Sequence, residues 1–182
     1  MKTVPESAFV TDVKELRRRA RQHVENGAVT ASYGGDKETI VRLLNEALAT
    51  EIVCVLRYRR HYFTAQGLAS KSVAEEFLEH SNEEQLHADQ LAQRITQLNG
   101  EPNLNPEGML SRSHAEYVEG KNLLEMIRED LIAERVAIES YTEMIRYVEG
   151  KDPTTRRLLE EILAKEEEHA DDMADLLAQH AK

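Results

Sequence analysis

Two short segments, EQLH at residues 84–87 and EEEH at residues 166–169, share the pattern Glu-x-x-His and indicate how this chain folds. A glutamate and a histidine three residues apart lie on one face of an α-helix. Each pair interrupts a stripe of apolar residues spaced three and four apart, as Phe77 and Leu91 show around the first pair. Both segments therefore place carboxylate and imidazole groups in a stripe that a helical bundle buries.

A lone glutamate interrupts the apolar stripe of each of two further helical stretches. These residues are Glu51 and Glu134, and they precede the glutamates of the two paired segments by 33 and 32 residues. A tyrosine follows each lone glutamate by seven residues, at Tyr58 and Tyr141. The spacing indicates an internal duplication, in which two helix pairs contribute equivalent groups to one site.

Capping signals divide the chain into four long helices. The predicted helices run from Asp36 to about Gln66, from Ser70 or Ser72 to Asn99–Gly100, from Asn122 to Gly150, and from Asp152–Pro153 almost to the end. Ser72 with Glu75, and Asn122 with Glu125, have the spacing of a capping box. With only four prolines, eight glycines and no tryptophan, the composition also favours long helices. Each helix would span roughly 45 Å.

The lengths of the connections predict the topology. The first and last connections are short, so each joins two helices into an antiparallel hairpin. Residues 100–121, which include Pro102 and Pro106, are long enough to cross the bundle from end to end. We predict an all-α fold, an antiparallel four-helix bundle with one long crossover over residues 36–182. Residues 1–35 form an N-terminal extension with an extra helix at about 6–26.

Composition limits the location and the partners. The longest apolar run, Ile52–Leu56, is far shorter than the roughly 20 residues of a membrane span. Charges at Glu6 and Asp12 interrupt any signal-peptide core, so we expect a cytoplasmic protein. The net charge of −11 argues against a general nucleic-acid binder. Cys54 is the single cysteine, which excludes a rubredoxin-type iron site and favours a small buried hydrophobe.

Four buried carboxylates need compensation, because each unpaired one costs several kcal/mol and like charges repel. The stripes offer no lysine or arginine at this level. Two divalent cations would supply the charge, and two neutral imidazoles would complete their coordination; the alternative is a set of solvated glutamates without metal. The predicted metal ligands are Glu51, Glu84, His87, Glu134, Glu166 and His169. A strict 33-residue repeat would make Glu167 the ligand. We select Glu166 instead, because it lies on the same helical face as His169.

On these residues the chain resembles the bacterioferritin branch of the ferritin-like superfamily, over residues 36–180. The resemblance implies that Glu84 and Glu166 bridge two iron ions within one subunit, with manganese or zinc as substitutes. Glu51 and His87 would complete one ion, and Glu134 and His169 the other. It also implies that Tyr58 hydrogen-bonds a ligand carboxylate and belongs with the six ligands to the catalytic set. For Tyr141, an anchoring hydrogen bond and a redox role both stay open.

The implied function is that of a ferroxidase, which oxidises Fe²⁺ with O₂ or H₂O₂ for iron storage or detoxification. Haem is not expected, because Gln85 stands where a bacterioferritin has its haem-ligating methionine. The chain ends thirteen residues after His169, too soon for the fifth helix of 24-subunit ferritins. The extra N-terminal helix instead matches twelve-subunit shells. We expect a homo-oligomer, from a dimer to a 12- or 24-subunit shell.

Two other functions remain as alternatives. One is a rubrerythrin-like di-iron or di-manganese peroxidase or catalase. The other is a DNA-associated stress-protection protein, because a basic run could contact phosphates. The run contains Lys14, Arg17, Arg18, Arg19 and Arg21. A solvated helix face or contact with an acidic neighbouring subunit is the favoured explanation of that run. His80, one turn before Glu84, is either a hydrogen-bonded core histidine, a support for a ligand or an accessory ligand.

Overall fold

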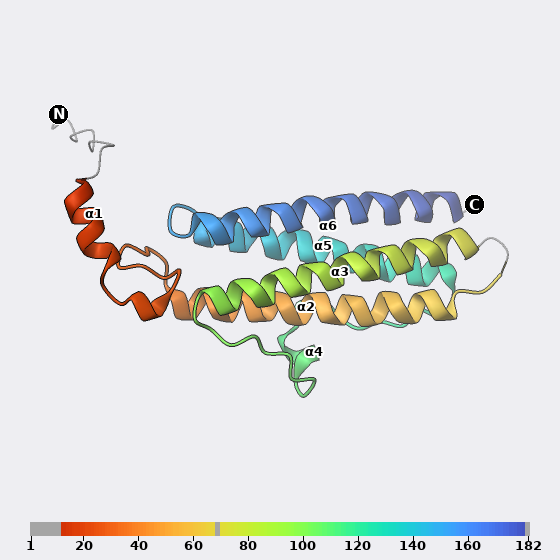
Figure 1. Cartoon of the computed structure of the whole chain (residues 1–182). Coiled ribbons are helices and arrows are strands. Elements are labelled where there is room, and N and C mark those ends of the chain that lie inside the picture. Colours follow the sequence, from red (N-terminus) through yellow and green to blue (C-terminus); the bar gives the residue numbers. More distant parts are fainter. Residues whose placement is uncertain (1–11, 68–69, 181–182) are drawn as a thin grey trace, which may run out of the picture.

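The four long predicted helices are present and pack side by side (Figure 1). The computed structural model describes residues 12–67 and 70–180, and this part of the chain contains helices but no strands. The elements are α1 (Val13–Ala20), the 3₁₀ turn η1 (Val24–Asn26), α2 (Lys37–Thr64), α3 (Lys71–Gln97), α4 (Met109–Arg112), α5 (Leu123–Val148) and α6 (Pro153–His180). The predicted all-α bundle is confirmed.

Side-chain caps start three of the long helices where the sequence predicts them. The carboxylate of Asp36 accepts a hydrogen bond from the backbone N–H of Thr39 at 3.4 Å, at the start of α2. Before α6, Asp152 accepts one from the backbone of Thr155 at 2.9 Å. Asn122 accepts from the backbone N–H of Glu125 at 3.0 Å and begins α5. Each contact satisfies a donor that the first helical turn leaves free.

The predicted capping box at Ser72 and Glu75 is wrong. The helix α3 already begins at Lys71, so Ser72 lies inside it and Ser70 takes the N-cap position. The hydroxyl of Ser70 donates to the carbonyl of Gly67 at 2.6 Å instead of capping the helix. The connecting turn thus competes for the cap residue, and spacing alone does not reveal this competition.

The crossover between α3 and α5 follows α2 from its beginning to its end. Its hydrogen bonds to α2 join Asn103 to Asn45 at 2.6 Å, His114 to Thr50 at 2.9 Å, and Glu116 to Arg57 at 2.8 Å. The short helix α4 lies on this path, beneath α2 in Figure 1. The crossover therefore delivers the chain to the far end of the bundle, and α5 runs antiparallel to α2.

Two apolar clusters fill the bundle on either side of its middle. Residues such as Ile40, Leu91 and Leu159 form the first cluster, and Phe77 and Ile127 belong to the second. Burial of each large side chain contributes about 1.5–3 kcal/mol. Between the clusters the interior is polar, and this layer holds the candidate site.

The N-terminal helix is shorter than predicted. The expected helix over 6–26 is wrong in its last part, because α1 ends at Ala20 and His23 takes a left-handed conformation (φ 52°). Its first residues lie outside the described part. None of the residues of α1 is buried, and Figure 1 shows this helix beyond one end of the bundle. Tyr33 connects the following segment to α6 by donating to Asp152 at 2.7 Å.

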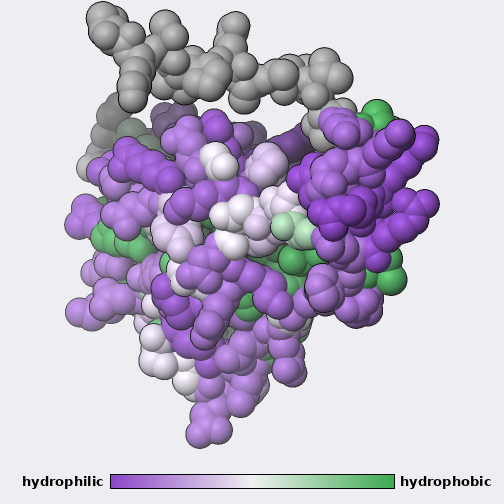
Figure 2. Space-filling view, turned by 90° about the vertical axis from the view of Figure 1, so that its left-hand side faces the viewer, coloured by the Kyte–Doolittle hydropathy of each residue, from purple (hydrophilic) through white to green (hydrophobic). Residues whose placement is uncertain are grey.

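The molecular surface is predominantly polar. In Figure 2, which faces the α1 end, hydrophilic residues cover most of the surface and hydrophobic ones form small patches. No helix in the described part of the chain is long and apolar enough to cross a membrane.

Candidate metal centre

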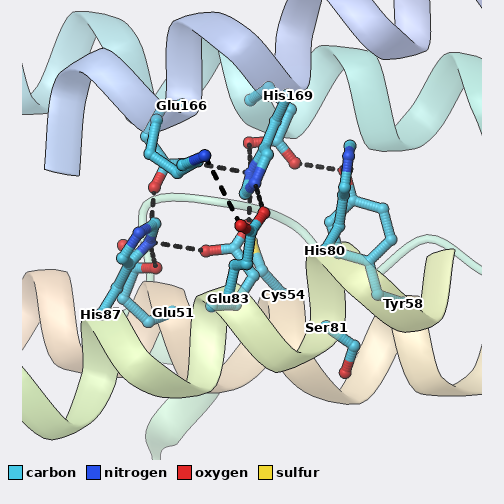
Figure 3. A network of polar contacts seen from close by, with 12 residues as sticks. Glu51, Cys54, Tyr58, His80, Ser81, Glu83, His87, Glu166 and His169 are labelled. Carbon is cyan, nitrogen blue, oxygen red and sulfur yellow. Dashed lines mark hydrogen bonds and ion pairs between the residues drawn. The ribbon is translucent and has the colours of Figure 1, made fainter. Parts of the chain in front are cut away.

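The structure brings the six predicted ligands together at the middle of the bundle. Four of them, Glu51, His87, Glu166 and His169, are labelled in Figure 3. Every long helix contributes, since α2 supplies Glu51, α5 supplies Glu134, and α3 and α6 each supply a glutamate and a histidine. His87 is the most exposed of the six, at 7%. Glu166 is fully buried whereas Glu167 is exposed, so helical facing rather than the strict repeat selects the residue in the core.

The six residues form two overlapping groups of potential ligands. In each group, one ligand atom per residue can be chosen so that all lie within 4.8 Å of one another. The groups are Glu51, Glu84, His87 and Glu166, and Glu84, Glu134, Glu166 and His169. Glu84 and Glu166 belong to both groups. The arrangement is therefore that of two adjacent cation sites with two shared carboxylates.

Both histidines turn Nδ1 towards the carboxylates. His87 Nδ1 lies 2.9 Å from Glu166 Oε1 and 3.4 Å from Glu51 Oε2. His169 Nδ1 lies 3.5 Å from Glu84 Oε1. The other ring nitrogen of His169, Nε2, donates to Glu83 Oε2 at 2.7 Å, which leaves Nδ1 as the nitrogen that faces the centre. Glu83 was not identified from the sequence, because it is partly exposed and lies off the stripe.

Several buried polar atoms of the centre have no hydrogen-bond partner among the described residues. They are Glu51 Oε2, Glu84 Oε1, both carboxylate oxygens of Glu166, and His169 Nδ1. A buried polar atom left unpaired costs about 1–3 kcal/mol, and more if charged. These atoms face one another and are all electron-pair donors to a cation. Oxygen and imidazole donors of this kind suit iron, manganese and zinc, so the residues fit the predicted metals.

Burial and mutual repulsion control the protonation of the carboxylates. Burial, assisted by the charge of Glu84, raises the pKa of Glu51 to about 8 and that of Glu134 to about 7. The same two causes raise the pKa of Glu166 well above its usual range. Burial also opposes ionisation of Glu84, but hydrogen bonds from its neighbours hold its pKa well below the usual range. Without a cation, the centre therefore retains protons at neutral pH.

The histidines gain protons from the same surroundings. Burial lowers the pKa of His169, but the nearby carboxylate of Glu84 outweighs burial and raises that pKa to about 9. Burial also opposes protonation of His87, but the carboxylate of Glu166, 2.9 Å from Nδ1, outweighs it and raises the pKa of His87 further. Occupation by metal ions would release these protons, because metal ligands must be deprotonated.

Two tyrosines hold the lone glutamates in a reciprocal arrangement. Tyr58 of α2 donates its hydroxyl proton to Glu134 Oε1 on α5, and Tyr141 of α5 donates to Glu51 Oε1 on α2. Each contact leaves the second carboxylate oxygen facing a histidine, as Glu51 Oε2 faces His87. The anchoring contact expected of Tyr58 is thus present, and Tyr141 makes its counterpart.

A buried ion-pair network that sequence analysis missed lies next to the centre. Arg57 Nε donates to Asp130 Oδ1 at 2.8 Å, and His61 Nδ1 donates to Asp130 Oδ2 at 2.7 Å. All three side chains are at most 1% exposed. Arg57 neighbours two further arginines in the sequence, so it resembles a surface residue. Since Asp130 already neutralises it, Arg57 does not compensate the four glutamates.

Two residues singled out in the sequence lie beside the centre without joining its two ligand groups. Cys54 is buried, as predicted, and burial raises the pKa of its thiol well above the usual range. Gln85 points away from the core and donates to Asp89 at 3.0 Å. Neither side chain is among the potential ligands of the two groups.

The fold recurs in proteins of known family. The ferritin-like domain model matches residues 41–182. A bacterioferritin of Mycobacterium leprae is 33% identical over 79% of this chain and 86% of its own. A nutrient stress-induced DNA-binding protein of Synechococcus is 34% identical over 74% of this chain and 78% of its own. A solved dodecameric thioferritin, the bacterioferritin-related protein of Bacteroides fragilis, has a TM-score of 0.78 and 32% identity over 81% of this chain and 89% of its own. The chain belongs to the ferritin-like family and is a protein of the bacterioferritin type.

Proposed function

We propose that the protein is a ferroxidase, which oxidises Fe²⁺ at a di-iron centre inside each subunit for iron storage or detoxification. One observation carries this proposal: six buried carboxylate and imidazole side chains converge as two ligand groups that share Glu84 and Glu166. Similarity to bacterioferritins supports the assignment of iron.

The two ligand groups give each residue a role. Glu84 and Glu166 belong to both groups and would be shared by the two ions. Glu51 with His87 would hold one ion, and Glu134 with His169 would hold the other. Manganese and zinc would bind the same donors, since carboxylate and imidazole ligands do not exclude them.

Iron in this centre supplies the electrons, because two Fe²⁺ ions give one electron each to the oxidant. With H₂O₂, two electrons and two protons yield two water molecules; with O₂, they yield one H₂O₂. The protein residues hold the geometry and the protons. Tyr58 and Tyr141 fix one oxygen of each lone glutamate, and Glu83 accepts from Nε2 of His169, which leaves Nδ1 as the nitrogen that can bind a metal. Burial excludes bulk water and strengthens each electrostatic contact.

We further propose that the subunits assemble into a homo-oligomeric shell. The thioferritin with the same fold is described as dodecameric, and its similarity extends over most of both chains. A shell would provide an interior for oxidised iron.

Aerobic titration with Fe²⁺, followed by gel filtration and iron analysis, tests the proposal. We expect rapid oxidation of two Fe²⁺ per chain, followed by slower uptake that comigrates with a large oligomer. The Glu84→Gln variant should lose the rapid phase. Oxidation that stops at two irons per chain would contradict storage. Rapid H₂O₂ dismutation by the manganese form, without iron uptake, would instead support a catalase-type enzyme.

DNA association is a second candidate function, favoured by the similarity to the Synechococcus DNA-binding protein. The exposed helix α1 carries Arg17, Arg18 and Arg19, although Arg18 already pairs with Glu15 at 2.7 Å. Phosphate contacts weaken steeply with salt. If α1 binds DNA, gel-shift retention will fall as salt rises and disappear on replacing the three arginines with glutamine. Equal retention by the variant would exclude this helix as the contact.

A further inference from the structure

Glu76, His80 and Asp172 form a separate cluster of potential ligands beside the four-glutamate centre. Glu76 and His80 belong to α3 and Asp172 to α6, and one ligand atom from each lies within 4.8 Å of the others. His80 Nε2 lies 3.4 Å from Glu76 Oε1 and 3.6 Å from Asp172 Oδ2. None of the three belongs to the two ligand groups proposed for the di-iron centre, and His80 connects the cluster to that centre because one of its ring nitrogens also lies within 4.8 Å of ligand atoms of Glu134 and His169.

The contacts of His80 determine which ring nitrogen carries its proton. Tyr58 has a single hydroxyl proton and donates it to Glu134. His80 Nδ1 lies 3.3 Å from the same hydroxyl oxygen, so the histidine is the donor in this contact when Glu134 is ionised. A neutral imidazole has one N–H and one lone pair, which places the lone pair of His80 on Nε2.

This lone pair faces two carboxylates that are also acceptors. His80 is only 1% exposed, and no hydrogen bond from the described residues reaches its Nε2. The side chains of Glu76 and Asp172 are 35% and 46% exposed, so solvent reaches the cluster from their side. Three electron-pair donors thus face one another around a point that ions can reach.

Partial burial and the negative charge in and around this cluster raise the pKa values of both carboxyl groups. Partial burial, then the charge of Asp172, raises the pKa of Glu76, and partial burial, then the charge of Glu168, raises the pKa of Asp172. A cation among the three ligand atoms would offset this negative charge. The spacing suits one, because ligand atoms about 2.0–2.2 Å from a tetrahedral ion lie about 3.3–3.6 Å apart.

We propose that Glu76, His80 and Asp172 form a third divalent-cation site, open to solvent and adjacent to the di-iron centre. Its mixed carboxylate and imidazole donors suit Fe²⁺, Mn²⁺ or Zn²⁺, with water completing the coordination. The His80 ring stacks on the ring of His169, with centroids 4.0 Å apart and planes at 20° (Figure 3). His80 thus contacts both the outer site and a ligand of the inner centre. That the outer site binds a divalent cation does not depend on the proposed function. That iron reaches the di-iron centre through this site would depend on it.

Zinc is a suitable probe because it is not oxidised. The test combines equilibrium dialysis of the full chain with anomalous scattering from Zn²⁺-loaded crystals. We expect a zinc peak about 2.0–2.2 Å from His80 Nε2, together with two inner zinc ions. The Glu76→Gln/Asp172→Asn double variant should bind one zinc fewer per chain. The matched control, Glu75→Gln/Asp171→Asn, removes the same charge from exposed neighbours and should bind as many as the wild type.

Each outcome separates this inference from the proposed function. Zinc in the inner centre with none at His80 would overturn the outer site and leave the di-iron proposal standing. A doubly protonated His80 would give this result. Zinc at His80 with none inside would support the outer site and refute the inner ligand assignment. Equal loss in the control variant would show that general negative charge, rather than the site, attracts the ion and would also overturn the inference.

Discussion

Glu83 accepts a hydrogen bond from Nε2 of His169 at 2.7 Å, and this contact leaves Nδ1 of the histidine facing the centre. The carboxylate of Glu83 is itself held by Lys165 at 3.5 Å. A carboxylate behind a metal-binding histidine fixes its tautomer and raises its basicity. At the scale of single residues, therefore, a partly exposed glutamate orients a buried histidine of the candidate centre.

Removing this support should weaken metal binding without emptying the centre. We expect Glu83→Ala to lower the affinity for Zn²⁺ by about 10–100-fold. Glu83→Gln, which retains an oxygen acceptor, should lose much less. Competition titrations against a chelator would measure both. Unchanged affinity in the alanine variant would show that the contact does not orient His169.

Candidate ligands could be predicted from the sequence where polar residues interrupt the apolar stripe of a helix. The six ligands of the candidate centre share this property, and the structure places them in one layer. The sequence did not predict the buried network of Arg57, His61 and Asp130. These charged residues are buried because they pair between helices that lie far apart in the sequence, and they do not interrupt an apolar stripe. Glu83 escaped because half-exposed glutamates are common on helical surfaces.

At the scale of elements, Asn122 illustrates an N-cap that the sequence predicts and the structure contains. Its side chain accepts from the backbone of Glu125, and Glu125 in turn accepts from the backbone N–H of Lys121 at 2.9 Å. Ser72 has the same sequence spacing, but it lies within α3 and caps nothing. The turn before α3 places Ser70 at the N-cap position, so the Ser-x-x-Glu spacing does not mark the start of this helix.

These two residues form a matched pair for a stability test. Asn122→Ala should lower the free energy of unfolding by about 1 kcal/mol, because the backbone N–H of Glu125 in the first turn of α5 loses its side-chain acceptor. Ser72→Ala should change it by no more than about 0.5 kcal/mol, as for an exposed helical site. Urea unfolding followed by circular dichroism measures both. An equal loss in the two variants would contradict the assigned start of α3.

The long helices and the crossover could be predicted from cap residues and connection lengths, which are local signals. The path of the crossover along α2 depends on distant hydrogen bonds, such as His114 to Thr50, and has no local signal. The predicted N-terminal helix was too long. The residues after Ala20 have a composition that favours a helix, but His23 takes a left-handed conformation and the helix ends before it.

At the scale of the whole molecule, the metal-free bundle carries an acidic cluster in the middle of its core. Three glutamates and His169 have folded-state pKa values above their ordinary ones. The folded chain therefore binds more protons than the unfolded chain between the ordinary and the raised values. Their stabilisation is complete below the unfolded pKa values and is lost as pH rises through the folded ones.

Metal-free protein should therefore become less stable as pH rises from 6.5 to 9. Glu134, Glu51 and His169 lose their protons in this window, at about 7, 8 and 9. The pKa of His80 is lowered to about 3, mainly by burial, and this opposes the trend only below pH 6.5. Calorimetry with a chelator should show Tm falling on the order of 5 °C over this range. Glu166→Gln should reduce this fall, and added Zn²⁺ should reverse it. A Tm that rises with pH in the chelated wild type would contradict the protonation assigned to the centre.

Helix pairing and internal duplication explain how four helices present equivalent groups at one level. The reciprocal contacts of Tyr58 and Tyr141 preserve this pseudo-symmetry across α2 and α5. Assembly of subunits depends on surfaces whose partners lie outside one chain, so sequence patterns within the bundle do not specify it.

The most direct test of the two-metal centre is anomalous scattering at the iron edge from crystals loaded anaerobically with Fe²⁺. The account predicts two peaks in each bundle, about 3.5–4 Å apart, with Glu84 and Glu166 between them. His87 Nδ1 should face one peak and His169 Nδ1 the other. A bundle that contains no iron at this level, or a single ion without a bridging carboxylate, would contradict it.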